Sequence, residues 1–96
     1  MSAFLVFHGT VNNADKFGDY AKGVPPTLQP FGGEIFLRGK ANKVLAGDHR
    51  QKIVAMLKFP DLEKAHSWYE SDAYQALIPT RDEAADITAI SYEELT

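Results

Sequence analysis

Two side chains in strand-like segments of the sequence have the chemistry of a ligand site. Arg38 stands next to Gly39 at the end of the segment EIFLRG, and its planar guanidinium suits bidentate capture of a carboxylate. An ion pair with Glu34 on the same strand is the alternative. His8, in the segment AFLVFHGTV, can act as an acid or base near neutral pH, although such a histidine is more often only hydrogen-bonded in place. We take Arg38 as a candidate ligand-binding residue and His8 as a weak candidate for both ligand binding and catalysis.

The stretch SWYESDAYQAL, residues 67–77, combines one tryptophan with two tyrosines and is followed by an arginine. Most of these side chains fit a hydrophobic core. Buried tyrosine hydroxyls nevertheless need hydrogen-bond partners, which an arginine or a bound acid can supply. An aromatic wall with one or two cations is what a flat anionic small molecule requires. The further candidate ligand-binding residues are Tyr20, Trp68, Tyr69, Tyr74 and Arg81.

Other kinds of site are not indicated. His8, His49 and His66 contain no pair at i, i+4 spacing, and no carboxylate completes a known metal-binding pattern. The chain has no cysteine, which excludes disulfides, thiolate zinc sites and cysteine nucleophiles. Gly32-Gly33 lacks the lysine and the following helix of a phosphate-binding loop. We therefore expect neither a metal nor a cofactor.

The composition is that of one small globular domain spanning residues 1–96. Of the 96 residues 45% are apolar and 24% charged, and the formal charge is -3. No block of like charge could follow a phosphate backbone, so we expect no nucleic-acid partner. No stretch approaches the roughly 20 apolar residues that span a bilayer, and the N-terminus has no basic lead-in to an apolar run. We expect a cytoplasmic protein without a membrane partner.

The first half of the sequence predicts a strand, a helix and a hairpin. Residues 3–11 read as a strand, and Asn12-Asn13 can cap a helix that begins near Ala14. Pro25-Pro26 must interrupt or kink this helix, with one more turn after them and Gly32-Gly33 at its end. Residues 34–39 and 52–59 read as strands of a β-hairpin, with 42–47 as a short strand-like segment leading into its turn.

The second half predicts two helical segments, a short final helix and a last strand. Asp61 can cap a helix that ends near Ser71, and Ser71 can cap a further turn or two. Pro79 should end that segment. Thr80 and Glu83 match a capping box, which starts the final helix at Thr80. With residues 86–92 as the last strand, the order is strand, helix, strand, strand, helix, strand, typical of the α+β ferredoxin-like βαββαβ fold with helices on one face of an antiparallel sheet.

Alternation along the strands predicts two different faces of the sheet. The face expected under the helices is wholly apolar: Leu5, Phe7, Ile35, Leu37, Ile53, Ala55, Leu57 and Phe59. The opposite face mixes apolar and ionisable residues: Phe4, Val6, His8, Thr10, Glu34, Phe36, Arg38, Lys52, Val54, Met56 and Lys58. A half-exposed antiparallel sheet can tolerate such a face in water. We favour a second copy of the chain that covers it across a two-fold axis, giving a homodimer.

With these elements placed, the sequence resembles the domain-of-unknown-function 1330 family of the dimeric α-β barrel superfamily. The resemblance rests on NADKFGDY (13–20), FGGEIFLRG (31–39), FPDLEKAHSWYESDAYQAL (59–77) and Arg81, with PP at 25–26 and VLAG at 44–47. It implies a ferredoxin-like homodimer in a family without an established activity. His8, His49 and Pro79 depart from the pattern of many relatives.

Two functions are compatible with these features. The first is a homodimer that binds a small, anionic or aromatic molecule and does no chemistry, consistent with the missing nucleophile, metal set and cofactor motif. The alternative is a cofactor-free enzyme of the small monooxygenase or isomerase type that uses His8 and Arg38. Relatives in the superfamily include enzymes of these types, which work in the cavity between helices and sheet. This alternative requires one pocket that contains both side chains.

Overall fold

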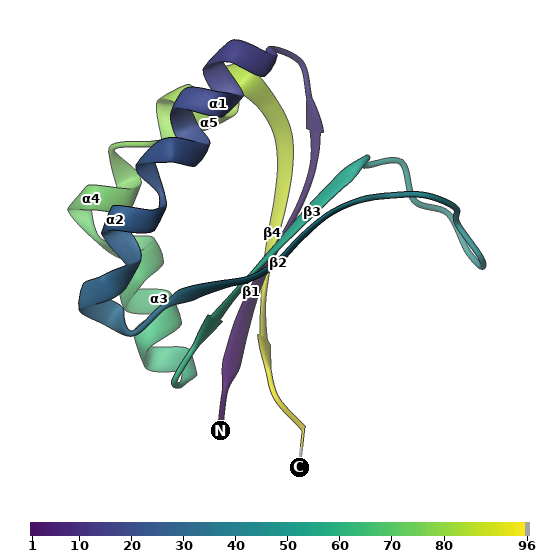
Figure 1. The fold of residues 1–96 in the computed structure, drawn as a ribbon. Coiled ribbons are helices and arrows are strands. Elements are labelled where there is room, and N and C mark those ends of the chain that lie inside the picture. Colours follow the sequence, from purple (N-terminus) through teal and green to yellow (C-terminus); the bar gives the residue numbers. More distant parts are fainter. Residues whose placement is uncertain (96) are drawn as a thin grey trace.

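The computed structural model describes residues 1–95 and has the predicted ferredoxin-like α+β architecture. Four antiparallel strands form one sheet in the order β2-β3-β1-β4, and the helices lie together on one side of it (Figure 1). In the described part of the chain, no helix is long and apolar enough to cross a membrane. The elements are β1 (Ala3–Val11), α1 (Ala14–Gly23), α2 (Pro25–Leu28), the 3-10 helix η1 (Gln29–Phe31), β2 (Glu34–Lys40), β3 (Ile53–Phe59), α3 (Leu62–Glu70), α4 (Asp72–Gln75), α5 (Ile78–Ala84) and β4 (Ala85–Glu93).

Side-chain caps begin three of the helices where the sequence predicts them. The Asn13 Oδ1 atom accepts a hydrogen bond from the backbone amide three residues later at 3.1 Å. Asp61 Oδ1 does the same for α3 at 2.8 Å, and Ser71 Oγ for α4 at 3.3 Å. Each cap satisfies an amide that the first helical turn leaves without a partner. The predicted cap positions at these three sites are confirmed.

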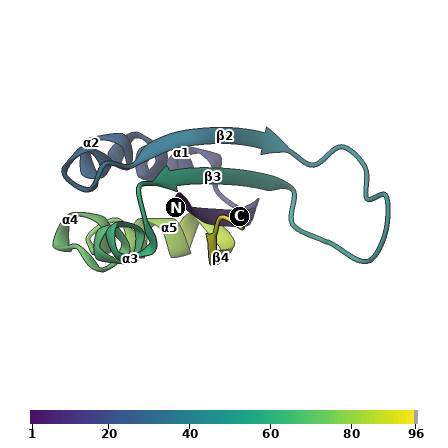
Figure 2. The ribbon, with the colours of Figure 1, turned by 90° about the horizontal axis from the view of Figure 1, so that it is seen from below.

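Two sequence predictions about local structure are wrong. Residues 42–47 form no strand; they belong to a loop over residues 41–52 that extends beyond the sheet (Figures 1 and 2). Apolar residues such as those in VLAG favour strand structure only where a neighbouring strand supplies hydrogen bonds. The last helix begins at Ile78 rather than at Thr80, with Pro79 inside its first turn. Proline is tolerated there because first-turn amides have no helical partner to lose.

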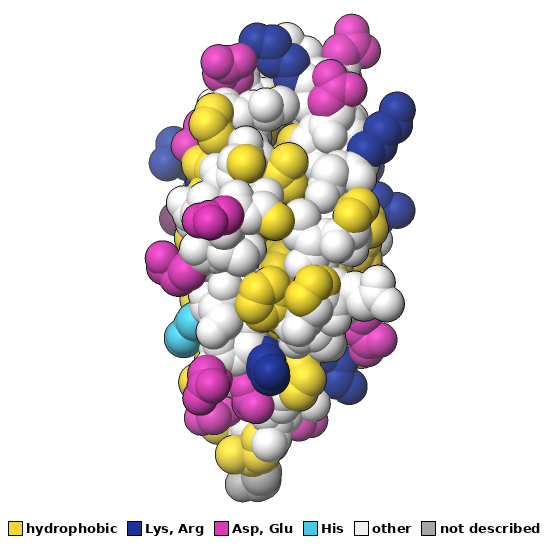
Figure 3. All heavy atoms as spheres, turned by 90° about the vertical axis from the view of Figure 1, so that its left-hand side faces the viewer, with side chains coloured by type: hydrophobic (Ala, Val, Ile, Leu, Met, Phe, Trp, Pro, Cys, Tyr) yellow, Lys and Arg dark blue, Asp and Glu magenta, His cyan; other side chains and the backbone are white. Residues whose placement is uncertain are grey.

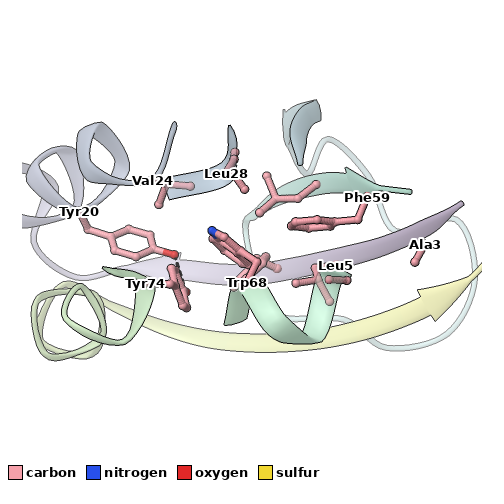
Figure 4. Close-up of a cluster of buried hydrophobic side chains, with 11 residues drawn as sticks. Ala3, Leu5, Tyr20, Val24, Leu28, Phe59, Trp68 and Tyr74 are labelled. Atoms are coloured by element: carbon pink, nitrogen blue, oxygen red, sulfur yellow. Dashed lines mark hydrogen bonds between the residues drawn. The ribbon is translucent and has the colours of Figure 1, made fainter. Parts of the chain in front are cut away.

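The core lies between the sheet and the helices. Phe59, Trp68 and Tyr74 are its largest fully buried side chains. Figure 4 shows Trp68 on α3 between Phe59 and Tyr74, with the Tyr20 hydroxyl directed toward Tyr74. On the outer side of the helices, acidic and basic side chains are intermixed with apolar ones and form no region of a single sign (Figure 3). The packing thus places α1, α3 and α5 over one face of the sheet and leaves the other without helices.

Candidate functional site

A β-bulge in β2 decides which way Arg38 points. In the pairing with β3, Ile35 lies opposite Leu57, but Leu37 lies opposite Met56 and Arg38 opposite Ala55. The register therefore shifts by one residue at Phe36. Directly paired residues share a face of the sheet, so Leu37 lies on the open face and Arg38 on the helix side.

This shift corrects the predicted faces at two positions. Strict alternation placed Leu37 under the helices and Arg38 beside His8 on the open face, and both predictions are wrong. The alternative of an ion pair between Arg38 and Glu34 along the strand is also wrong, because Glu34 lies opposite Lys58 on the open face whereas Arg38 lies on the helix side. Among the described residues, neither salt bridge of the protein involves Arg38.

Arg38 lines a cavity of about 210 Å³ between α1 and the β2–β3 edge of the sheet. Apart from Arg38 and Tyr20, the residues that line it are apolar. Ile35 and Arg38 are exposed and lie on the edge strand, which places them at the outer rim. The main apolar side chains of the wall are Phe7, Phe17, Val24, Ile35, Ile53 and Ile87.

The predicted aromatic residues meet behind this cavity in one buried cluster. The Trp68 and Tyr74 rings lie 4.2 Å apart between centroids, and the Tyr69 and Tyr74 rings 5.1 Å apart. Tyr74 and Tyr20 join through their hydroxyl oxygens at 2.8 Å. Of these four aromatic residues, only Tyr20 lines the cavity.

Arg81 is the cation of this cluster. It is only 9% exposed, and its Nη1 donates hydrogen bonds to Tyr69 Oη and Tyr74 Oη, both at 3.1 Å. Its Nε donates to Asp82 Oδ1 at 3.0 Å. Arg81 thus donates to hydroxyls from two helices, the half-buried Tyr69 of α3 and the buried Tyr74 of α4, as expected for a charge taken out of water.

Burial shapes the acid–base behaviour of this cluster. It is the main cause that raises the pKa of Tyr20 above its ordinary value, with the neighbouring Tyr74 adding to the effect. Burial likewise raises the pKa of Tyr74, while the hydrogen-bond contacts with Tyr20 and Arg81 oppose this rise. Burial alone would lower the pKa of Arg81, but its hydrogen bonds to Tyr69 and Tyr74 outweigh this and raise it. Both tyrosines therefore remain neutral hydroxyls and Arg81 remains a cation at any physiological pH.

His8 lies on the other side of the sheet from this cavity. It sits opposite Val54 and Thr88 in the ladders, and its ring stacks edge-on against His49 of the 41–52 loop at 5.1 Å between centroids. Consequently His8 and Arg38 do not share a pocket within the chain. The single pocket that the enzyme alternative requires is therefore not formed within one protomer.

Some residues that shape the site have no chemical signature in the sequence. Thr27 is one: its Oγ1 accepts a hydrogen bond from Trp68 Nε1 at 2.8 Å and donates to the carbonyl of Val24 at 2.6 Å. The need of a buried indole for an acceptor indicates that such a partner exists, but not which residue it is. Phe17 and Ile87 of the cavity wall read only as ordinary core residues.

The same architecture occurs in solved structures of low sequence identity. A protein of unknown function from Rhodopseudomonas palustris matches with a TM-score of 0.81 at 16% identity, over 99% of this chain and 83% of that chain. A dimeric ferredoxin-like protein of unknown function from Jannaschia sp. CCS1 has a TM-score of 0.79 at 10% identity, over 98% and 100%. SnoaB, a cofactor-independent oxygenase from Streptomyces nogalater, has a TM-score of 0.72 at 8% identity, over 99% and 94%. At these identities the likeness establishes the fold alone, which is ferredoxin-like.

The family follows from the sequence. The model of a domain of unknown function, DUF1330, matches residues 2–95. The chain belongs to this family, so the predicted resemblance is confirmed. No curated protein sequence matches the chain.

Proposed function

We propose that this protein is a homodimer that binds a small, mostly apolar molecule with one anionic group in the cavity between α1 and the sheet. The observation that carries the proposal is the bulge at Phe36, which brings Arg38 to the rim of a cavity with apolar walls. Arginine pairs with carboxylates through two parallel hydrogen bonds. A charged rim on an apolar cavity favours a carboxylic acid with an apolar body.

The cavity size restricts the body of such an acid. Its volume is about 210 Å³, whereas an apolar cavity of about 150 Å³ is enough to bind benzene. A substituted benzoate or a short branched aliphatic acid fits these dimensions. Phe17 and Tyr20 on α1 supply aromatic surface against a flat ring.

Titration calorimetry with 4-isopropylbenzoate tests this binding. We expect the wild-type protein to bind the acid and to bind the uncharged 4-isopropylbenzamide more weakly. Arg38→Gln should weaken binding of the acid about tenfold, since a hydrogen bond to a charged group contributes about 1.5 kcal/mol. Lys64→Gln is the matched control, because it removes the same charge from an exposed side chain on α3 that does not line the cavity. Equal affinity in wild type and Arg38→Gln, or no binding by either, contradicts the proposal.

The homodimer is proposed through the open face of the sheet. The bulge places two consecutive apolar residues, Phe36 and Leu37, on this face opposite Met56. The Phe36 ring packs edge-on against Phe4 at 5.4 Å, under the Lys58 ammonium at 5.9 Å. Large apolar side chains are exposed across the face: Phe36 (55%), Tyr92 (48%), Leu37 (47%) and Ile90 (40%). A contiguous apolar surface of this kind on a small domain favours a protein partner, and the dimeric protein from Jannaschia has this fold.

Sedimentation equilibrium tests the dimer. We expect the wild-type protein to sediment as a dimer at micromolar concentration and Leu37→Asp to sediment as a monomer, because a buried unpaired carboxylate is costly at an interface. Ala73→Asp introduces the same charge on the exposed side of α4 and should leave the dimer intact. A monomeric wild-type protein, or a dimeric Leu37→Asp variant, contradicts this interface.

A further inference from the structure

The donors and acceptors of the hydrogen bonds behind the cavity can be assigned from the chemistry of the groups. A guanidinium has only donors, so in the contact between Arg81 Nη1 and Tyr74 Oη the tyrosine oxygen accepts. Tyr74 is fully buried, and its hydroxyl hydrogen needs an acceptor. Among residues 1–95, the only other polar atom in hydrogen-bond contact with that hydroxyl is Tyr20 Oη, at 2.8 Å. Donation from Tyr74 to Tyr20 satisfies this hydrogen, and the chain then runs from Arg81 through Tyr74 to Tyr20.

This direction leaves the hydrogen of Tyr20 for another acceptor. Within the described residues, the Tyr20 hydroxyl has no hydrogen-bond contact besides the one with Tyr74, in which it is the acceptor under this assignment. Because burial keeps this hydroxyl neutral, it retains its hydrogen. A hydroxyl that accepts from a chain headed by a cation is also a stronger donor than an isolated one. Tyr20 is the tyrosine that lines the cavity, so the available space for an acceptor is the cavity itself.

We infer that Tyr20 determines ligand specificity: it donates a hydrogen bond to an acceptor oxygen on the ligand, at a point separate from the anionic group held by Arg38. The inference rests on the proposed function. Arg38 lies on β2 and Tyr20 on α1, and the wall between them is apolar. The ligand class is consequently narrower than an apolar acid. It is a compact keto acid or other oxygen-bearing acid in which a carbonyl, ether or similar acceptor is separated from the carboxylate by an apolar body.

Two probes of nearly the same shape separate this inference from the proposed function. The acids 4-acetylbenzoate and 4-isopropylbenzoate share the carboxylate and the ring, and a methyl group of the second replaces the carbonyl oxygen of the first. Titration calorimetry with the wild-type protein should show about fivefold tighter binding of the ketone, the affinity equivalent of one hydrogen bond. In Tyr20→Phe this preference should disappear, whereas Arg38→Gln should weaken both probes and keep it. Tyr69→Phe, which removes a hydroxyl outside the cavity wall, should also keep it.

The ratio of the two affinities distinguishes recognition from a structural role. A Tyr20→Phe variant that only loosens the fold weakens both probes equally and leaves the ratio unchanged, which overturns the inference. Equal affinities in the wild-type protein overturn it as well, while the proposed acid binding stands. If neither probe binds, both proposals fall. Infrared difference spectra provide a second readout: the ketone stretch of bound 4-acetylbenzoate should shift to lower frequency in the wild-type protein and not in Tyr20→Phe.

Discussion

The Tyr74→Phe substitution tests whether the buried hydroxyl chain stabilises the fold. It removes one oxygen and keeps the aromatic ring, whose centroid lies 4.2 Å from that of Trp68. Two hydrogen bonds are lost, the one from Arg81 at 3.1 Å and the one to Tyr20 at 2.8 Å. The substitution changes the volume of the side chain by only this one atom and leaves the neighbouring residues as they are. The effect on stability is therefore a hydrogen-bond effect rather than a cavity effect.

The expected loss can be estimated from these contacts. A hydrogen bond from a charged donor contributes about 1.5–3 kcal/mol and a neutral one about 1 kcal/mol. Arg81 keeps its bonds to Tyr69 and Asp82, which places the charged contribution at the lower end. We expect Tyr74→Phe to lower the free energy of unfolding by about 2.5 kcal/mol, a large part of the roughly 5–15 kcal/mol typical of a domain. For a chain of 96 residues, this lowers Tm by roughly 10–20 °C.

Urea unfolding followed by circular dichroism measures this change. The midpoint should fall while the slope of free energy against urea stays the same. Variants must be compared at equal protein concentration, because dimer formation adds a concentration-dependent contribution. Tyr69→Phe is the matched control: it removes one bond from Arg81 on a half-buried tyrosine, and we expect a loss of about 1 kcal/mol. The reasoning is refuted if Tyr74→Phe is no less stable than Tyr69→Phe.

Two further predictions concern pH and packing. Because burial raises the pKa of Tyr20 and Tyr74 above the ordinary 10.0, the native state holds these protons more tightly than the unfolded state. The contribution of the two tyrosines to the free energy of unfolding is therefore fully present below pH 10 and decreases as the pH rises above it. Above pH 10 the slope should approach about 1.4 kcal/mol per pH unit for each tyrosine. Urea midpoints between pH 9 and 11 should show this decrease, and Tyr20→Phe should remove the contribution of one tyrosine. A pH-independent midpoint would count against the prediction. Gly33→Ala should lower the free energy of unfolding by about 1–3 kcal/mol, since a Cβ there would lie 2.6 Å from Cε2 of the buried Phe59 ring. Gly18→Ala, which has open space around its Cβ, is the control in the same unfolding assay. Equal stability of the two variants would refute the packing argument.

Local interactions explain why much of the fold could be predicted from the sequence. Asn13, Asp61 and Ser71 cap helices through bonds that span only three residues, so the signal lies within a few positions of the chain. The alternation in β1 and β3 indicates their buried face in the same local way. Trp68, Tyr69 and Tyr74 lie within seven residues of one another in the sequence, so this short stretch indicates an aromatic group in the core.

The site depended on contacts that the sequence does not specify. In IFLR, alternation alone directs Leu37 inward and Arg38 outward, and only the pairing with β3 reverses both through the bulge. Likewise, the contact between Tyr20 and Tyr74 joins residues 54 positions apart, and its direction depends on Arg81 from a third helix.

The sequence by itself determined the elements, their order and the family, because these depend on short-range patterns and on a match along the chain. Only the tertiary structure decided which face Arg38 occupies, that His8 lies apart from it, and which tyrosine reaches the cavity. The physical reason is that a shift of one residue in strand register moves a side chain to the opposite face of a sheet. Such a register depends on the partner strand and leaves no mark in the local sequence pattern.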